Sequence, residues 1–156
     1  IMKKLKVDWT AMCRSDGCSF EKWKMMKESG CIGVKIGYES GSQRVIDKII
    51  NKKLDLKIAK ETTKKLLDIG LKVHGTFTYG LPGETKEDMI TTRKYLESLN
   101  LTSYQESGTA EIEGTPLSNL EEGGLAKYPE GIKDSNYDKF KDGQIKISEI
   151  KKAASI

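Results

Sequence analysis

The stretch Gly80-Leu81-Pro82-Gly83-Glu84-Thr85 lies where a strand pattern over 71–79 changes to a helix pattern over 86–98. Its two glycines and its proline predict a tight turn that brings bare backbone close to whatever binds above the strand end. Thr85 is placed to cap the following helix, with Asp88 three residues later in a capping-box position. We therefore expect a strand, a ligand-facing turn and a capped helix in succession.

The same order of features occurs earlier in the chain. Val34 to Tyr38 has a strand pattern and runs into Glu39-Ser40-Gly41-Ser42. In α/β proteins, ligands bind at the edge where parallel strands end, so the two loops are expected to open side by side. The sequence thus predicts a binding edge built from glycine-rich loops and carboxylates.

Strand and helix patterns alternate along the chain, which indicates a mostly parallel sheet with crossover helices. Three predicted helices end at Gly30, Gly70 and Asn100, residues that readily adopt the left-handed conformation of a helix stop. The predicted strands cover 5–12, 31–38, 71–79 and 102–110, and the predicted helices cover 20–28, 42–50, 56–69 and 86–99. The fold class is therefore α/β, with about four parallel strands.

The composition describes a polar globular protein. Of the 156 residues, 32% are charged and 37% are apolar, the net charge is +4 and the mean hydropathy is -0.53. No apolar run approaches the length of a membrane span. The lysines are spread along helices together with Glu and Asp, which favours solvated helix faces over a nucleic-acid surface. A cytoplasmic location is expected, where cysteines stay reduced.

Several motifs together resemble the radical S-adenosylmethionine (radical SAM) enzymes. The resemblance is closest to the subgroup that often carries a cobalamin-binding domain upstream and that includes methyltransferases and anaerobic cyclases. It extends from Lys3 to about Leu117 and rests on the order and approximate spacing of the motifs at 9–14, 30–31, 37–45, 51–52, 80–85 and 113–117. Single motifs of this kind arise by chance, whereas their joint order is specific.

The resemblance implies a partial TIM-type (β/α) barrel, of which four strands would form the second half. Because Ile1 precedes Met2 inside a strand-like run, we expect this chain to be the C-terminal part of a larger enzyme, with the N-terminal half of the barrel as its partner. Residues 1–118 are assigned to the half-barrel and 119–156 to an irregular extension, with a short helix near 148–154. The first strand would then have an open edge.

The resemblance also implies a [4Fe-4S] cluster held by a Cys-x3-Cys-x2-Cys loop. Cys13, Cys18 and Cys31 are separated by four and twelve residues and do not form that loop. We interpret them as buried, small apolar residues, and expect no metal ligand in this chain. The fragment alone is therefore predicted to be inactive. The full-length enzyme is predicted to use SAM and the cluster, with cobalamin as a further candidate cofactor, on a small-molecule substrate.

The site residues are assigned from the same resemblance. Glu39 is suited to accept hydrogen bonds from a ribose hydroxyl or an ammonium group. Arg14 could pair with the methionine carboxylate of SAM through its planar fork, or with Asp16 in a surface salt bridge. Lys52 could reach the same carboxylate or lie in solvent. The remaining candidates face SAM through loop backbone: Ser40, Gly41, Gly80, Leu81, Pro82 and Gly83.

Other polar residues have simpler interpretations. His74 is predicted to be a packed, hydrogen-bonded core residue, and Glu84 to stabilise the helix start electrostatically. Tyr104, Gln105 and Glu106 lie on the last strand, where alternation allows only one face to point into the barrel. Two alternative functions stay open at this point: an α/β enzyme that binds phosphate at the loop 80–85, and a non-catalytic scaffold domain.

Overall fold

The computed structural model describes residues 7–109 and 146–155. Four strands form one sheet in the order β1-β2-β3-β4, and every neighbouring pair is parallel. The strands are β1 (Trp9–Cys13), β2 (Cys31–Glu39), β3 (Lys72–Tyr79) and β4 (Ser103–Gly108). The predicted parallel sheet is confirmed. The first strand was predicted over 5–12, but residues 7 and 8 precede β1, which begins at Trp9. Residues 5 and 6, the motif at 113–117 and most of the predicted extension lie outside the described residues.

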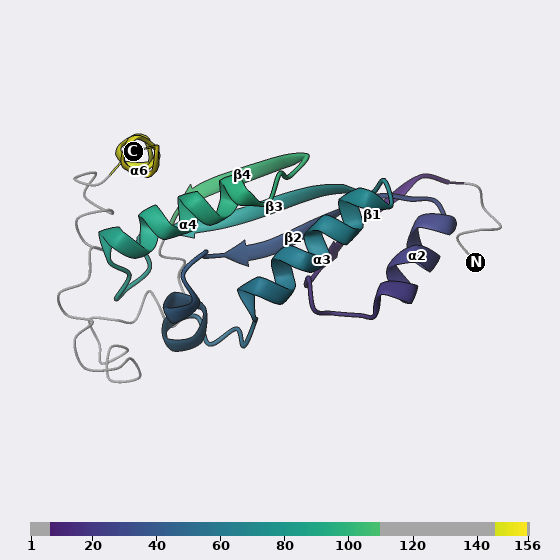
Figure 1. Ribbon diagram of the computed structural model, residues 1–156, viewed down its shortest axis with the longest axis horizontal. Coiled ribbons are helices and arrows are strands. Elements are labelled where there is room, and N and C mark those ends of the chain that lie inside the picture. The colour runs from purple at the N-terminus through teal and green to yellow at the C-terminus, as the bar shows by residue number, and fades with distance from the viewer. Residues whose placement is uncertain (1–6, 110–145, 156) are drawn as a thin grey trace.

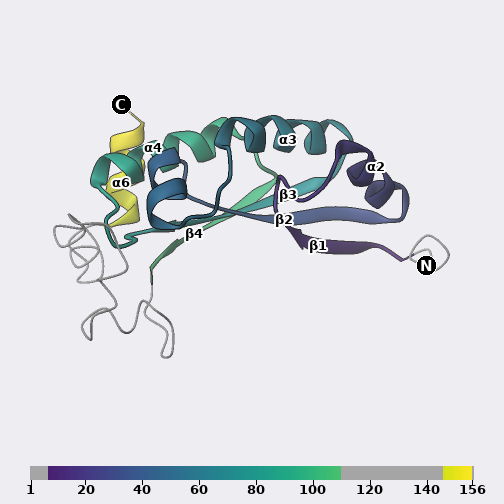
Figure 2. The ribbon, with the colours of Figure 1, turned by 90° about the horizontal axis from the view of Figure 1, so that it is seen from below.

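The helices lie on one face of the sheet, and all but the last connect successive strands, as Figures 1 and 2 show. They are α2 (Phe20–Glu28), the π-helix η1 (Val45–Ile49), α3 (Leu56–Asp68), α4 (Lys86–Ser98) and α6 (Ile147–Ala154). The opposite face of the sheet carries no helix in the described part of the chain (Figure 2). None of the helices in this part of the chain has the length and hydrophobicity of a membrane-spanning segment.

The core lies between the sheet and its helices because the strands alternate. Val34, Ile36 and Tyr38 of β2 and Phe77 of β3 are buried on the helix side. The rings of Tyr38 and Phe77 stack with their centres 5.3 Å apart. Leu66 of α3 is buried in the same cluster. Side chains at the intervening strand positions therefore face the side without helices.

The helix boundaries follow the predicted signals. The carboxylate of Asp55 accepts hydrogen bonds from the backbone N–H groups of Lys57 and Ile58 at the start of α3. Gly30, Gly70 and Asn100 have φ angles of 99°, 77° and 51°, as expected for helix stops. α6 matches the short helix predicted near residues 148–154.

The predicted helix at 42–50 contains the π-helix η1. There the backbone N–H of Ile50 donates to the carbonyl of Val45, and that of Lys52 donates to the carbonyl of Ile46. A π-helical turn holds one residue more than an α-turn, and such turns are frequent at functional sites. This wide turn leads directly to Lys52, one of the predicted site residues.

Candidate functional site

A cavity of about 430 Å3 lies where β2 and β3 end. Its lining residues come from β2, the segment after η1, β3 and the loop after β3: Glu39, Ile50, Lys52, Thr78 and Leu81. The structure therefore brings Glu39, Lys52 and the loop 80–83 to one edge of the sheet. Thr78 and Ile50 were not singled out by sequence reasoning, although the strand alternation places Thr78 on the same face as Glu39.

Glu39 has an unusual backbone conformation. Its φ angle is 66°, in the left-handed region that residues other than glycine seldom adopt. The backbone N–H of Ser40 donates to the carbonyl of Tyr38 at 2.9 Å, which closes a tight turn around Glu39. The pairing with β3 shifts register at the same point. Strained residues of this kind cluster at binding and catalytic sites, because the surrounding structure must hold them in place.

The Glu39 carboxylate forms an ion pair with Lys52. The Lys52 Nζ lies 3.1 Å from Glu39 Oε1 and 2.5 Å from the carbonyl oxygen of Gly37. Thr78 Oγ1 donates to Glu39 Oε2 at 3.4 Å. An ammonium group has three N–H donors, so one N–H of Lys52 makes no hydrogen bond within residues 7–109 and 146–155. The pair presents a carboxylate and an ammonium group together at the cavity.

Gly37 makes room for this pair. A side chain at Gly37 would start with a Cβ atom 2.3 Å from Glu39 Oε1 and 3.3 Å from Lys52 Nζ. Residues 37 and 39 both project to the side without helices. The glycine at 37 therefore allows the carboxylate to fold back over the strand toward Lys52.

Arg14 is engaged by a neighbour. Its Nε and Nη2 atoms donate to the two carboxylate oxygens of Asp16 at 2.9 and 2.8 Å, and Nη2 also donates to the carbonyl of Lys52 at 3.1 Å. The hydrogen bond to Asp16 raises the pKa of Arg14, and the Arg14 hydrogen bond lowers the pKa of Asp16. Of the two predicted partners, the structure shows Asp16. Arg14 also supports the backbone that carries the Lys52 side chain.

Ser40 and Gly41 are packed against α4. The hydroxyl groups of Ser40 and Thr92 lie 2.9 Å apart, and the backbone N–H of Gly41 donates to Thr92 Oγ1 at 3.0 Å. A Cβ atom on Gly41 would lie 2.4 Å from Cβ of Tyr95. These two residues fix the loop to the helix and leave Glu39 at the cavity.

The loop 80–83 folds around the buried carboxylate of Glu84. Its Oε2 atom accepts hydrogen bonds from the backbone N–H groups of Gly80 and Leu81 at 2.6 and 3.1 Å. Burial raises the pKa of Glu84 to about 8, although these two hydrogen bonds act in the opposite direction. Glu84 does more than stabilise the helix start, as the sequence suggested, because it organises the loop. Leu81 is the loop residue that lines the cavity.

The start of α4 forms a second polar network, which sequence reasoning found only in part. Thr85 and Asp88 form the predicted capping box. Asp88 also accepts hydrogen bonds from Ser42 and from the guanidinium of Arg44, and Arg44 Nη2 donates to the carbonyl of Gly83 at 2.8 Å. Burial alone would raise the pKa of Asp88, but these hydrogen bonds lower it below its ordinary value. The network joins the two glycine-rich loops.

The residues of the last strand separate by face. Glu106 lies on the helix side, where it accepts a hydrogen bond from Tyr79 at 2.8 Å and pairs with Lys151 at 2.6 Å. The guanidinium of Arg93 on α4 lies over the Tyr104 ring, on the same side. Gln105 therefore faces the side without helices.

The prediction that His74 lies in the core is wrong. His74 on β3 also faces the side without helices, because its neighbours Val73 and Gly75 take the buried positions.

The three cysteines do not fit a cluster site. Cys13, Cys18 and Cys31 are free thiols whose pKa values are raised by burial. Residues 7–109 and 146–155 contain no group of three His, Cys, Asp or Glu side chains placed to hold a metal ion. Cys31 belongs to the buried core, and Cys13 and Cys18 pack against it.

The sequence model described as the Radical SAM superfamily matches residues 2–96. The chain belongs to this superfamily. Radical SAM enzymes use S-adenosylmethionine and a [4Fe-4S] cluster, the two cofactors that the sequence predicted. The family membership also confirms the predicted enzyme class.

Two relatives with similar sequences are named as methyltransferases. An uncharacterized methyltransferase of Pyrococcus horikoshii is 32% identical over 113 residues, which cover 72% of this chain and 24% of that protein. Cytidylyl-2-hydroxyethylphosphonate methyltransferase of Streptomyces wedmorensis is 33% identical over 114 residues, covering 69% of this chain and 21% of that protein. The chain thus spans a quarter or less of the length of these relatives.

Solved radical SAM structures share the fold. The match to coproporphyrinogen III oxidase from Escherichia coli covers 96% of this chain and 36% of that protein's chain, with a TM-score of 0.68 and 14% sequence identity. The methyltransferase TsrM from Kitasatospora setae was solved with cobalamin and a [4Fe-4S] cluster bound. The match covers 78% of this chain and 24% of the TsrM chain, with a TM-score of 0.64 and 16% sequence identity. At these identities the likeness concerns the fold, a part of a TIM-type barrel.

Proposed function

We propose that this chain forms the SAM-facing wall and part of the substrate cavity of a radical SAM enzyme that transfers a methyl group or forms a ring. The observation that carries the proposal is the Glu39–Lys52 pair, held by a strained backbone at the carboxyl edge of the sheet. Two relatives named as methyltransferases support the first of the two reactions.

Each member of the pair has a distinct role in this proposal. Glu39 accepts hydrogen bonds from a ribose hydroxyl or from the ammonium group of SAM, and Lys52 donates its third N–H to the carboxylate of SAM. Thr78 holds the second oxygen of Glu39, and Leu81 supplies an apolar wall. Arg14 acts through Asp16 and the Lys52 carbonyl as a positioning residue. The donors and acceptors at this cavity thus fit a zwitterionic cofactor.

The cofactors supply the radical or methyl-transfer chemistry, and this chain orients SAM and excludes water. Because the described cysteines do not fit a cluster, we propose that the cluster ligands and the other barrel strands come from other parts of the full-length protein. A cobalamin domain would also belong to those parts. The short span that this chain covers in its relatives supports this division.

The phosphate-binding alternative finds little support in the loop geometry. A phosphate at the start of α4 would need free backbone N–H groups. Those of Gly80 and Leu81 donate to Glu84, and that of Thr85 donates to Asp88. The protein's own carboxylates thus accept these three N–H groups, which are not free to bind a phosphate.

The test is the affinity of the full-length protein for SAM, measured by calorimetry under anaerobic conditions. Glu39→Ala removes one or more charge-assisted hydrogen bonds, so SAM affinity should fall about 10- to 100-fold. The matched control is Glu61→Ala on the exposed surface of α3, which should leave the affinity unchanged. Unchanged affinity in Glu39→Ala, with an intact circular dichroism spectrum, would refute the assignment.

A further inference from the structure

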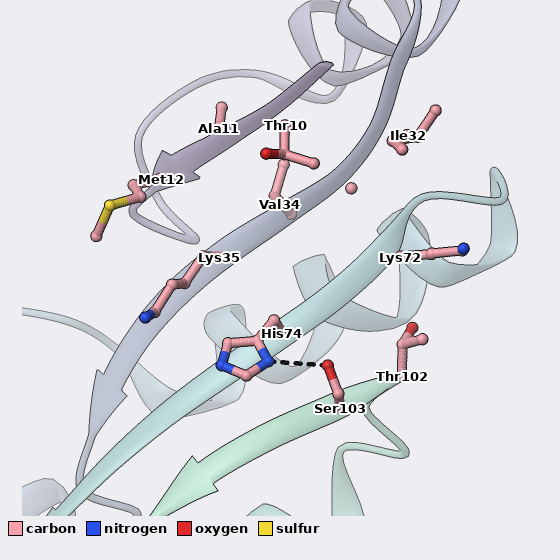
Figure 3. A pocket seen from close by; sticks show the side chains of 11 residues that line it. Thr10, Ala11, Met12, Ile32, Val34, Lys35, Lys72, His74, Thr102 and Ser103 are labelled. Atoms are coloured by element: carbon pink, nitrogen blue, oxygen red, sulfur yellow. Dashed lines mark hydrogen bonds between the residues drawn. The ribbon is translucent and has the colours of Figure 1, made fainter. Parts of the chain in front are cut away.

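A second cavity, of about 370 Å3, lies on the sheet face without helices, toward the start of the strands (Figure 3). Its wall on the β1 and β2 side is largely apolar and includes Ala11, Met12 and Ile32. The wall on the β2, β3 and β4 side carries Lys35, His74 and Ser103, with Lys72 and Thr102 beside them. The cavity therefore offers an apolar half and a cationic half.

The polar groups form a row across three strands. Lys35 pairs in register with His74, and His74 pairs in register with Ser103. The His74 Nδ1 atom lies 2.8 Å from Ser103 Oγ, which fixes the orientation of the ring. Figure 3 shows the other ring nitrogen turned away from Ser103, toward the side on which Lys35 lies. The row thus holds an oriented imidazole next to an ammonium group.

No carboxylate lines this cavity within the described residues. Neither Lys35 nor Lys72 forms an ion pair or a side-chain hydrogen bond in that part of the chain. Other cationic side chains near the sheet are paired, such as Arg14 with Asp16 and Lys52 with Glu39. Within the described residues, no acidic side chain therefore offsets the positive charge of this cavity.

We propose that this cavity binds an anionic group of the substrate, a phosphoryl, phosphonate or carboxylate group attached to an apolar part. The inference rests on the proposed function, because it places the substrate on the same sheet face as the SAM-facing wall. Lys35 provides charge, and His74 and Ser103 provide directed hydrogen bonds. The apolar part of the substrate contacts Met12 and Ile32.

The spacing of the two cavities restricts the substrate further. His74 and Thr78 are four residues apart on β3, and a strand rises about 3.3 Å per residue, so they are separated by roughly 13 Å. Thr76 lies between them on the same face of β3, and its register partner Gly37 lies beneath the Glu39–Lys52 pair. A substrate anchored at Lys35 must therefore reach about 13 Å to present its reacting atom at the SAM-facing wall.

The experiment measures binding of three probes to the full-length protein by calorimetry: phenyl phosphate, benzoate and uncharged benzyl alcohol. At least one anion should bind, and benzyl alcohol should bind at least tenfold more weakly. A preference for phenyl phosphate indicates a phosphoryl or phosphonate substrate, and a preference for benzoate indicates a carboxylate. Equal binding of benzyl alcohol, or binding of no probe, would overturn the proposal.

Variants locate the anion site. Lys35→Met should weaken the preferred anion about 10- to 100-fold, because it removes a charge-assisted contact but keeps the apolar stem. Lys35→Arg should retain most of the affinity. Lys60→Gln, on the exposed surface of α3, is the matched control and should change nothing. Equal anion affinity in Lys35→Met and Lys60→Gln would contradict the assignment.

The same variants separate this inference from the proposed function. Lys35→Met should keep SAM affinity, whereas Glu39→Ala should lose it. If Glu39→Ala weakens SAM but Lys35→Met leaves anion binding unchanged, only the anion site is wrong. If Lys35→Met weakens the anion but Glu39→Ala keeps SAM affinity, the SAM-facing wall is wrong and the cavity still binds an anion.

Discussion

Gly37 and Gly41 lie close together around the end of β2, yet the space beside each is taken by different neighbours. A Cβ atom at Gly37 would meet the ends of two flexible side chains, Glu39 and Lys52. A Cβ atom at Gly41 would meet Cβ of Tyr95 and Cα of Thr92, at 2.4 and 2.8 Å. Side-chain ends move easily and backbone atoms do not. Gly37 therefore makes room for the binding site, and Gly41 makes room for the packing of the loop against α4.

Gly37→Ala is expected to displace the Glu39 carboxylate from Lys52 while leaving the fold intact. SAM affinity should fall about tenfold, a loss of roughly 1.4 kcal/mol, while the thermal unfolding midpoint changes little. Gly41→Ala should do the reverse, because overpacking costs about 1–3 kcal/mol of stability. Calorimetry with SAM and thermal unfolding of both variants provide the comparison. Equal loss of stability in both would contradict the separation.

Glu84 predicts a pH dependence of stability. The folded protein holds the Glu84 proton up to about pH 8, whereas the ordinary pKa is 4.5, so the folded state binds more protons between these values. Stability should therefore decrease as the pH rises through this window, by at most about 1.4 kcal/mol per pH unit from this group. Glu84→Gln stays neutral and can still accept the two backbone hydrogen bonds, so this contribution should vanish.

The measurement is the thermal unfolding midpoint of the wild type and of Glu84→Gln between pH 5 and 8.5. The effect is the difference between the two proteins in the slope of the midpoint against pH. Glu87→Gln, at an exposed position of α4, controls for the loss of a surface charge. Parallel slopes for the wild type and Glu84→Gln would show that the proton bound by the folded state belongs to another group.

At the scale of the helices, the capping box of α4 predicts a stability change. Thr85 Oγ1 accepts a hydrogen bond from the backbone N–H of Asp88 at 3.2 Å, and Asp88 Oδ2 accepts one from the backbone N–H of Thr85 at 2.9 Å. Thr85→Ala should cost about 1 kcal/mol and lower the unfolding midpoint by about 2–4 °C. Thr91→Ala, at an exposed position inside the same helix, should cost nothing, because Ala has a higher helix propensity than Thr. A Thr85→Ala variant as stable as Thr91→Ala would argue against the cap.

The elements show what local sequence signals can predict. The cap at Thr85 and the helix stops at Gly70 and Asn100 depend on backbone preferences of single residues, and these were predicted correctly. The four strands were predicted in the right order, but β1 starts later than predicted, at Trp9. The π-helix η1 was missed because its extra residue is accommodated by tertiary contacts around Lys52. The tight turn at Glu39 was missed for a similar reason, since nothing in the sequence marks a glutamate for a positive φ angle.

At the scale of the whole molecule, the resemblance to radical SAM enzymes predicted which edge of the sheet binds a ligand. It did not predict which side chains at that edge pair with each other. Glu39 and Lys52 were both named from motifs, yet their ion pair depends on a register shift and a wide helical turn that bring distant segments together. His74 was misplaced although strand alternation could have placed it, because Val73, Phe77 and Tyr79 take the buried positions of β3 and leave His74 on the other face. The row that it forms with Lys35 and Ser103 depends on strand register, which only the folded sheet defines.

The whole sheet also separates the chain's two indole rings from its binding edge. Trp23 is buried on α2, and Trp9 lies at the start of β1, where its indole N–H donates to the carbonyl of Ser29 at 3.0 Å. Trp9 thus begins β1 beside the end of α2, whereas Glu39 is the last residue of β2. Figure 1 shows α2 near one end of the sheet and α4 near the other. Intrinsic fluorescence of this region would report the docking of α2 and would be insensitive to what occupies the carboxyl edge.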